Sequence, residues 1–121
     1  MSEAHGYVEV NELKSGKNNF VGMFGYSDEH GVTLYSNAVI RNGCRKHHVE
    51  HYALNFLLGR LTAENVSNIP IRVECEQLVK EIMDGQRGQP WNLSDVNLSR
   101  RMIQGVNCWL ELPPVTHENT L

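Results

Sequence analysis

The sequence predicts one α/β domain over residues 1–121, built on a mixed β-sheet with the element order βββαβααβ. The first forty residues contain short runs in which apolar and polar side chains alternate, as they do in strands. From about residue 46 the apolar residues recur with the spacing of an amphipathic helix. A strand-like run, two helical segments and a final strand then follow, and this order implies a parallel portion in the sheet.

The three N-terminal strands are expected to form an antiparallel meander. Tyr7–Val10 alternates and places its two valines on one side. Phe20–Tyr26 is the second strand, and Val32–Ile40 is the third. Asp28–Gly31 joins these two strands as a hairpin turn, because glycine adopts a positive φ without steric cost.

A long amphipathic helix is predicted from about Lys46. One stripe of this helix is apolar except at its first position, which is a glutamate. If the stripe packs on the sheet, Glu50 points inward near the start of the helix, where a carboxylate needs a partner, a metal or a route to water. The residues of the stripe are Glu50, Ala53, Leu54, Leu57, Leu58 and Leu61.

The next strand is predicted over Ile69–Cys75, where apolar residues alternate again. Pro70 belongs at the beginning of this strand, because proline cannot donate a hydrogen bond to a neighbouring strand. A second helix follows from about Glu76 and ends near Gly85.

A third helix is predicted after a loop, with Ser94 or Asp95 as its N-cap. Cys108–Leu112 is the last strand, and two prolines stop it. Trp109, in that strand, is expected to pack in the core, whereas Trp91 lies in the loop and is expected to be exposed.

Composition limits the possible functions. The chain has 40% hydrophobic and 21% charged residues, which is typical of a folded domain. Its formal net charge is −3, so any affinity for nucleic acid must come from a local basic patch. Three scattered cysteines favour a reduced, cytoplasmic setting over a disulfide framework. No apolar run approaches a membrane span, so no membrane partner is expected.

Three segments follow one another in a characteristic order. Val49–Leu54 reads VEHYAL, and Arg72–Val79 reads RVECEQLV. Trp109–Leu112 reads WLEL, and His117–Asn119 follows it as HEN. In this order they resemble ribonuclease H, and especially the short ribonuclease H-like domains related to reverse transcriptase tails, whose motifs are "AEYxAL" at the start of the first helix, "VxGDSQLV", and a last strand followed by the "EN" that precedes the final "AD". The resemblance implies the ribonuclease H-like fold over nearly the whole chain.

In this family four carboxylates hold two magnesium ions beside a scissile RNA phosphate, where the metals activate water and neutralise the leaving oxygen. The resemblance places Glu50 at the helix carboxylate. Cys75 stands where the central aspartate belongs, and Glu76 stands at the following serine. The aspartate of the first strand has no clear counterpart, although Glu9 lies nearby. The fourth carboxylate is expected two residues after Leu121.

One matching carboxylate of four predicts a catalytically degenerate domain that needs no cofactor, since cysteine is a soft ligand and does not replace aspartate on magnesium. The alternative is an active magnesium-dependent ribonuclease H that cleaves RNA in RNA–DNA hybrids. It requires a shifted register in which Glu74 or Glu76 takes the place of the central aspartate, beside Glu50 and one of Glu9 or Glu12.

Two other sites are candidates. His47 and His51 are spaced i, i+4 beside Glu50, so a helix places both on one face, as in zinc sites. The alternative is that they are ordinary surface histidines. Cys75 is a possible nucleophile if a base lies close, and otherwise a buried cysteine that acts as a small hydrophobe.

Basic residues gather in two places and are candidates for nucleic-acid contacts. Arg41, Arg45 and Lys46 precede the first helix, and Arg100 and Arg101 lie on the third. Three functions therefore stay open. The first is a non-catalytic module that binds RNA, an RNA–DNA hybrid or a protein, the second is the active nuclease, and the third is a protein–protein or homodimer module.

Overall fold

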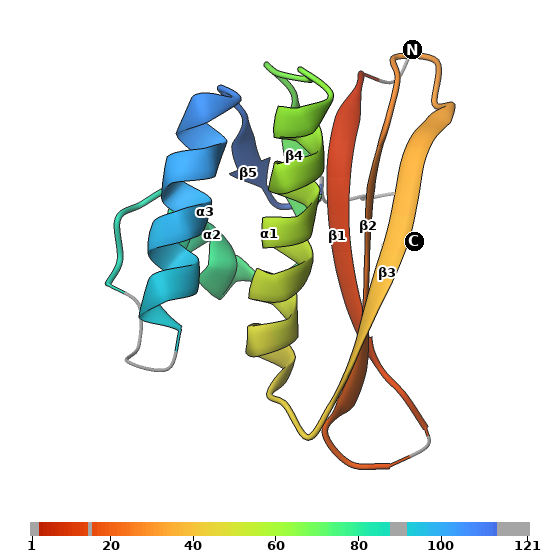
Figure 1. Cartoon of the computed structure of the whole chain (residues 1–121), viewed down its shortest axis with the longest axis vertical. Helices are drawn as coiled ribbons and strands as arrows, with labels where there is room; N and C mark the ends of the chain where they lie inside the picture. Colours follow the sequence, from red (N-terminus) through yellow and green to blue (C-terminus); the bar gives the residue numbers. More distant parts are fainter. Residues whose placement is uncertain (1–2, 15, 88–91, 114–121) are drawn as a thin grey trace, which may run out of the picture.

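A five-stranded mixed sheet carries three helices on one of its faces (Figure 1). The computed structural model describes residues 3–14, 16–87 and 92–113. Its elements follow the order βββαβααβ, which confirms the predicted α/β fold class. No helix among the described residues is long and apolar enough to cross a membrane.

The strands are β1 (His5–Glu12), β2 (Asn19–Ser27), β3 (Thr33–Asn42), β4 (Pro70–Val73) and β5 (Trp109–Glu111). They lie side by side in the order β3-β2-β1-β4-β5. The first three are antiparallel, while β4 runs parallel to β1 and β5 runs parallel to β4. The meander and the parallel portion are therefore both present, with β1 at their junction.

The helices are α1 (Lys46–Ala63), α2 (Glu76–Ile82) and α3 (Leu93–Gly105). Helix α1 packs on the strands of the meander, and α2 and α3 pack beside it. The core lies between α1 and the sheet, where burying leucine side chains contributes about 1.5–3 kcal/mol each. The fully buried leucines of α1 are Leu54, Leu57, Leu58 and Leu61.

A glycine lets α1 approach the sheet closely at the end where its histidines lie. A Cβ atom at Gly22 of β2 would stand 3.2 Å from the Cβ of Ala53 and 3.2 Å from Cγ1 of Val49. A methyl group at this position would therefore require the neighbouring side chains to shift by a few tenths of an ångström. Gly31 has the positive φ of 80° that the predicted β2–β3 turn requires.

Two local predictions are wrong. Helix α3 begins at Leu93 with Asn92 at its N-cap, so Ser94 and Asp95 lie inside its first turn. Trp109 is 39% exposed, because the alternation of the last strand turns its neighbour Leu110 toward the core instead. Trp91 and His117–Asn119 lie outside the described residues.

Candidate functional site

Helices α1 and α2 bring two histidines and two glutamates into one buried cluster. His47 Nδ1 lies 2.9 Å from Glu50 Oε1, and His47 Nε2 lies 2.6 Å from Glu81 Oε1. His51 Nε2 approaches the same oxygen of Glu81 at 2.9 Å. The side chains of His51 and Glu81 are 0% and 1% exposed, whereas His47 retains 19% of its surface. Neither histidine is an ordinary surface residue.

The two histidines differ in charge. Burial alone would lower the pKa of His47, but hydrogen bonds with Cys75, Glu50 and Glu81 outweigh it and raise this pKa to about 10. His47 is therefore an imidazolium at neutral pH, and it donates one N–H to each glutamate. Burial lowers the pKa of His51, which is therefore neutral. Burial also opposes the charge on Glu81, but its hydrogen bonds to His51 and His47 hold its pKa below the usual range.

The buried side chain of Asn92 completes the cluster from the start of α3. Its Nδ2 lies 3.3 Å from Glu81 Oε2 and 3.4 Å from His51 Nε2. It makes no capping bond to its own helix. Two buried atoms here, Asn92 Oδ1 and His51 Nδ1, are without a hydrogen-bond partner among the described residues. Such atoms are uncommon in protein interiors, because each costs about 1–3 kcal/mol.

Glu81 and Asn92 were not among the residues singled out from the sequence. For Glu81 a signal existed, because it lies three residues after Leu78 and directly before Ile82 on the buried stripe of α2. This is the pattern that identified Glu50, which the structure also places inward, with 8% of its surface exposed. For Asn92 no local pattern distinguishes its role from that of an ordinary N-cap residue.

Cys75 is only partly buried and lies at the N-cap of α2, directly after β4. None of its neighbours in the sequence offers a base, but α1 brings a histidine close, since His47 Nδ1 lies 3.6 Å from the sulfur. The same nitrogen is 2.9 Å from Glu50 Oε1. Because His47 already holds both of its protons at neutral pH, it is poorly placed to accept the proton of a thiol.

Of the other predicted carboxylates, Glu9 and Glu76 do not join Glu50, whereas Glu74 lines a small cavity beside it. On β1, Val8 and Val10 face α1 and are buried, while Glu9 between them is exposed. Glu76 is also exposed, on the first turn of α2. Among the described residues, the groups whose ligand atoms come close enough to share an ion each contain a histidine, and none contains three carboxylates.

The small cavity beside Glu50 lies on the side where the resemblance places the other metal-binding carboxylates. It is lined by apolar side chains from β1 and β4, by Glu74, and by Lys46 and Cys75. Its apolar lining residues are Val8, Val10, Val73 and Leu78.

The predicted basic residues do not form one continuous patch of free side chains. Arg100 donates through Nε to the carbonyl of Glu81 and through Nη2 to that of Gln86, so it holds the segment after α2 in place. Arg41 lies over the ring of Tyr52, with 5.0 Å between Cζ and the ring centroid. Arg45 and Lys46 lie at the start of α1.

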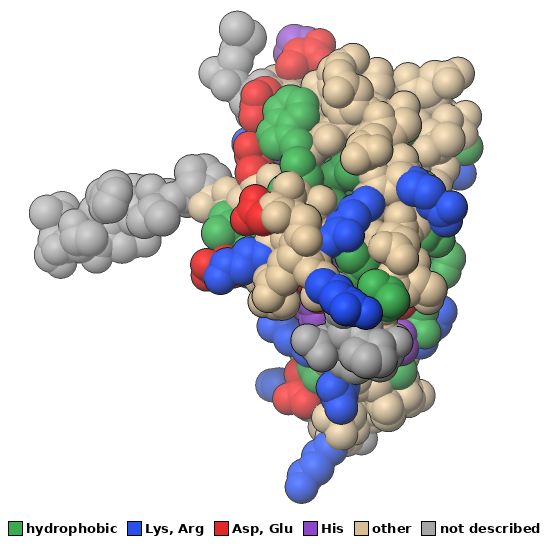
Figure 2. Space-filling view, turned by 90° about the vertical axis from the view of Figure 1, so that its left-hand side faces the viewer, with side chains coloured by type: hydrophobic (Ala, Val, Ile, Leu, Met, Phe, Trp, Pro, Cys, Tyr) green, Lys and Arg blue, Asp and Glu red, His purple; other side chains and the backbone are tan. Residues whose placement is uncertain are grey.

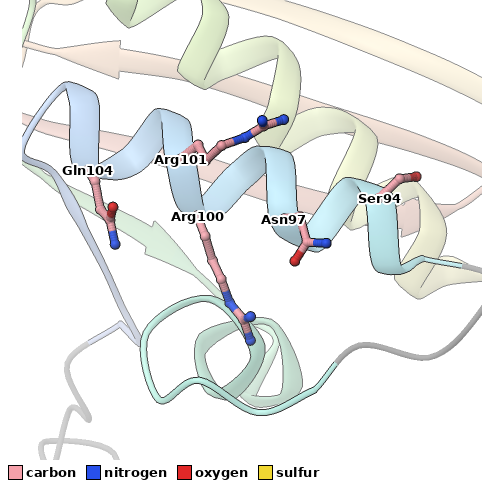
Figure 3. Close-up of a pocket in the computed structure, with 5 residues that line it drawn as sticks. All are labelled: Ser94, Asn97, Arg100, Arg101 and Gln104. Atoms are coloured by element: carbon pink, nitrogen blue, oxygen red, sulfur yellow. The ribbon is translucent and has the colours of Figure 1, made fainter.

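The outer face of α3 presents a row of hydrogen-bond donors along a shallow groove. Ser94, Asn97, Arg101 and Gln104 line it together with Arg100 (Figure 3). In Figure 3 the side chains of Arg100 and Arg101 extend from α3 in different directions, and Arg100 reaches toward α2. Figure 2 shows further Lys and Arg side chains spread over this face of the molecule.

Known proteins show similarity in structure but not in sequence. No family profile matches this chain, and no curated protein sequence matches it either. Ribonuclease H1 of Halobacterium salinarum superposes with a TM-score of 0.74, covering 98% of this chain and 89% of that one at 14% identity. The chain has a ribonuclease H-like fold.

Two further structures support this fold. LC11 ribonuclease H1, isolated from compost by a metagenomic approach and solved in complex with an RNA/DNA hybrid, has a TM-score of 0.77 at 14% identity. The alignment covers 93% of this chain and 86% of that one. The N-terminal ribonuclease H domain of a Mycobacterium tuberculosis protein has a TM-score of 0.76 at 8% identity, with 98% and 88% covered. These identities establish the fold alone.

Proposed function

We propose that this chain is a ribonuclease H-like domain that binds nucleic acid without cleaving it. The observation that carries the proposal is the set of side chains around Glu50. Magnesium requires an octahedral shell of oxygen ligands. Here Val8 and Val10 occupy the strand face below Glu50. Cys75 follows the end of β4, and in the described part of the chain Glu74 is the one other carboxylate that lines the cavity. This donor set does not fit a pair of magnesium ions.

Glu50 itself is already engaged. Its Oε1 accepts a hydrogen bond from the imidazolium of His47 at 2.9 Å, which supplies the positive charge that a buried carboxylate needs. A magnesium ion would have to displace this contact, with Glu74 as the one other carboxylate among the described residues that lines the cavity beside Glu50. A nuclease activity that depends on Glu50 is therefore not expected.

The binding half of the proposal rests on α3. Hydroxyl, amide and guanidinium groups are typical contacts to nucleic-acid phosphates. The row of Ser94, Asn97, Arg101 and Gln104 offers these groups at intervals of three or four residues along one helix face. LC11 ribonuclease H1, which shares the fold, was solved with an RNA/DNA hybrid, and this favours the hybrid as the first ligand to test.

Binding is tested by fluorescence anisotropy with a labelled RNA–DNA hybrid, measured over a range of salt concentrations. We expect Arg101→Gln to weaken binding severalfold and to reduce the slope of log affinity against log salt by about 0.9, the loss of one phosphate contact. Arg60→Gln is the control, because the substitution removes the same charge from a side chain that lies over Tyr35 of β3, pairs with Glu64 and does not line the groove of α3.

Cleavage is tested with the same hybrid in excess magnesium. We expect intact RNA with both the wild-type chain and Glu50→Gln. Magnesium-dependent cleavage that Glu50→Gln abolishes would refute the non-catalytic half of the proposal. If Arg101→Gln and Arg60→Gln bind the hybrid equally well, α3 is not the interface.

The edge of the sheet favours a second candidate function, self-association. Strand β3 is an edge strand of ten residues, and Leu34 and Ile40 on it are each 57% exposed. Unprotected edges pair readily with a second strand. Light scattering decides between the candidates, since a monomer that binds the hybrid argues against a dimerisation module.

A further inference from the structure

We propose that His47, His51 and Glu81 form a binding site for a divalent transition metal of the zinc class, with Oδ1 of Asn92 as the fourth ligand. The site lies between α1, α2 and the start of α3. The inference rests on this cluster alone and does not depend on nucleic-acid binding.

The first argument is geometric. One ligand atom from each of His47, His51 and Glu81 lies within 4.8 Å of the other two. His47 and His51 are one helical turn apart on α1, and α2 holds Glu81 opposite them. In a tetrahedral zinc site the ligand atoms are about 3.3 Å apart, as the usual bond lengths of about 2.0–2.2 Å require. The present separations of 2.6 and 2.9 Å from Glu81 Oε1 need to open only slightly to admit an ion.

The second argument comes from Asn92, which is fully buried and aimed into the cluster. As assigned, its Nδ2 faces His51 Nε2 at 3.4 Å, while its Oδ1 has no partner. If His51 donates its Nε2 proton to Glu81, the Asn92 Nδ2–His51 Nε2 contact places two N–H donors face to face. A half-turn of the amide brings Oδ1 to face His51 Nε2 and Glu81, where the three acceptor atoms can hold a cation together.

The donor types select the metal. Imidazole nitrogen suits zinc, copper, nickel and cobalt, whereas magnesium and calcium prefer oxygen. Two histidines and one glutamate are an established ligand set for zinc. Because the side chain of His47 keeps 19% of its surface exposed, an ion can reach the cluster from solvent on that side.

A second, overlapping set competes with this assignment. His47, Glu50 and Cys75 also bring one ligand atom each within 4.8 Å of one another, with Nδ1 of His47 in place of Nε2. We favour the first set because His51 and Glu81 are almost fully buried and Asn92 adds a fourth donor. The two sets can be distinguished by absorption spectroscopy, since only the second contains a thiolate.

The test is a titration of the full chain, freed of metal with a chelator, with Co²⁺ followed by absorption spectroscopy and with Zn²⁺ followed by calorimetry. We expect one equivalent to bind, with tetrahedral d–d bands of Co²⁺ and no thiolate-to-metal charge-transfer band. His47→Gln, whose side chain is partly exposed, is expected to weaken binding at least about tenfold while the circular dichroism spectrum stays unchanged.

His48→Gln is the matched control. It changes a neighbouring histidine that faces Asp95, at 3.6 Å, and that belongs to neither ligand group found among the described residues. Binding that His48→Gln reduces as much as His47→Gln would overturn the proposal. So would a thiolate band, or the absence of Zn²⁺ binding by the folded wild-type chain at millimolar zinc.

Discussion

Replacing Glu81 by glutamine removes the charge at the centre of the buried cluster while keeping its shape. The glutamine keeps one side-chain oxygen in the place of Glu81 Oε1, which accepts hydrogen bonds from His47 and His51. The imidazolium of His47 then retains only Glu50 as a charged partner. In the wild-type chain Nδ2 of Asn92 lies 3.3 Å from Glu81 Oε2. In the variant the new amide points its own N–H groups toward Nδ2, so that two donors face each other.

The expected cost follows from the burial of the pair. Removing one partner of a buried ion pair destabilises a protein by about 3–5 kcal/mol, because the other charge is left uncompensated. Since His47 keeps Glu50 and has partial access to water, we expect the lower end, about 3 kcal/mol. A domain of this kind is stable by about 5–15 kcal/mol, so Glu81→Gln still folds.

The assay is urea unfolding followed by circular dichroism at pH 7 with a chelator present. Glu76→Gln is the matched control, because it makes the same change on the same helix. Its carboxylate is 70% exposed and pairs with Lys80 at 3.4 Å, so its loss costs no more than about 0.5 kcal/mol. If both variants lose the same stability, Glu81 does not act as a buried charge and the cluster as described is wrong.

Three further predictions concern the packing and titration of the fold. In chelated protein, the raised pKa of His47, about 10, means that its stabilisation is complete below pH 6.5 and is lost as the pH rises toward 10; urea midpoints should show this decline in the wild type and not in His47→Gln. Tyr26→Phe removes a hydroxyl that donates to Glu64 at 2.8 Å, so we expect a loss of about 1 kcal/mol in urea unfolding, and an unchanged midpoint would contradict the bond. Gly22→Ala should cost about 1–3 kcal/mol, because its new methyl meets Ala53; NMR should show shifts in the His47 ring, and an unperturbed ring would exclude a movement of α1.

The order of the elements and the inward position of Glu50 follow from the periodicity of the sequence. Alternation and helical spacing report burial on one face, and packing against a sheet enforces that burial along a whole element. Local signals were less reliable. Asp95 follows the usual N-cap pattern, yet the N-cap of α3 is Asn92, three residues earlier, and its side chain contacts Glu81 in place of its own helix.

The site could be predicted only in part, because its members come from three separate helices. The i, i+4 spacing of His47 and His51 places them on one face, but their shared partner Glu81 lies 30 residues after His51. The pairing of α1 with α2 depends on β4 lying beside β1, a tertiary fact that no local pattern contains. The contact between Cys75 and His47 could not be predicted for the same reason, because these residues are 28 positions apart in the sequence.

A buried carboxylate requires a positive partner, and the nature of that partner determines what a site can do. Beside Glu50 the partner is the imidazolium of His47, which also serves Glu81. A proton on imidazole neutralises charge but offers no open coordination position for a phosphate oxygen or a water. Val8 and Val10, which line the cavity beside Glu50, supply no oxygen ligand for magnesium, and Glu74 is the other carboxylate there in the described part of the chain. The cluster is therefore suited to hold a proton or a histidine-binding metal, and our proposal that this chain does not cleave RNA rests on these side chains and not on the fold.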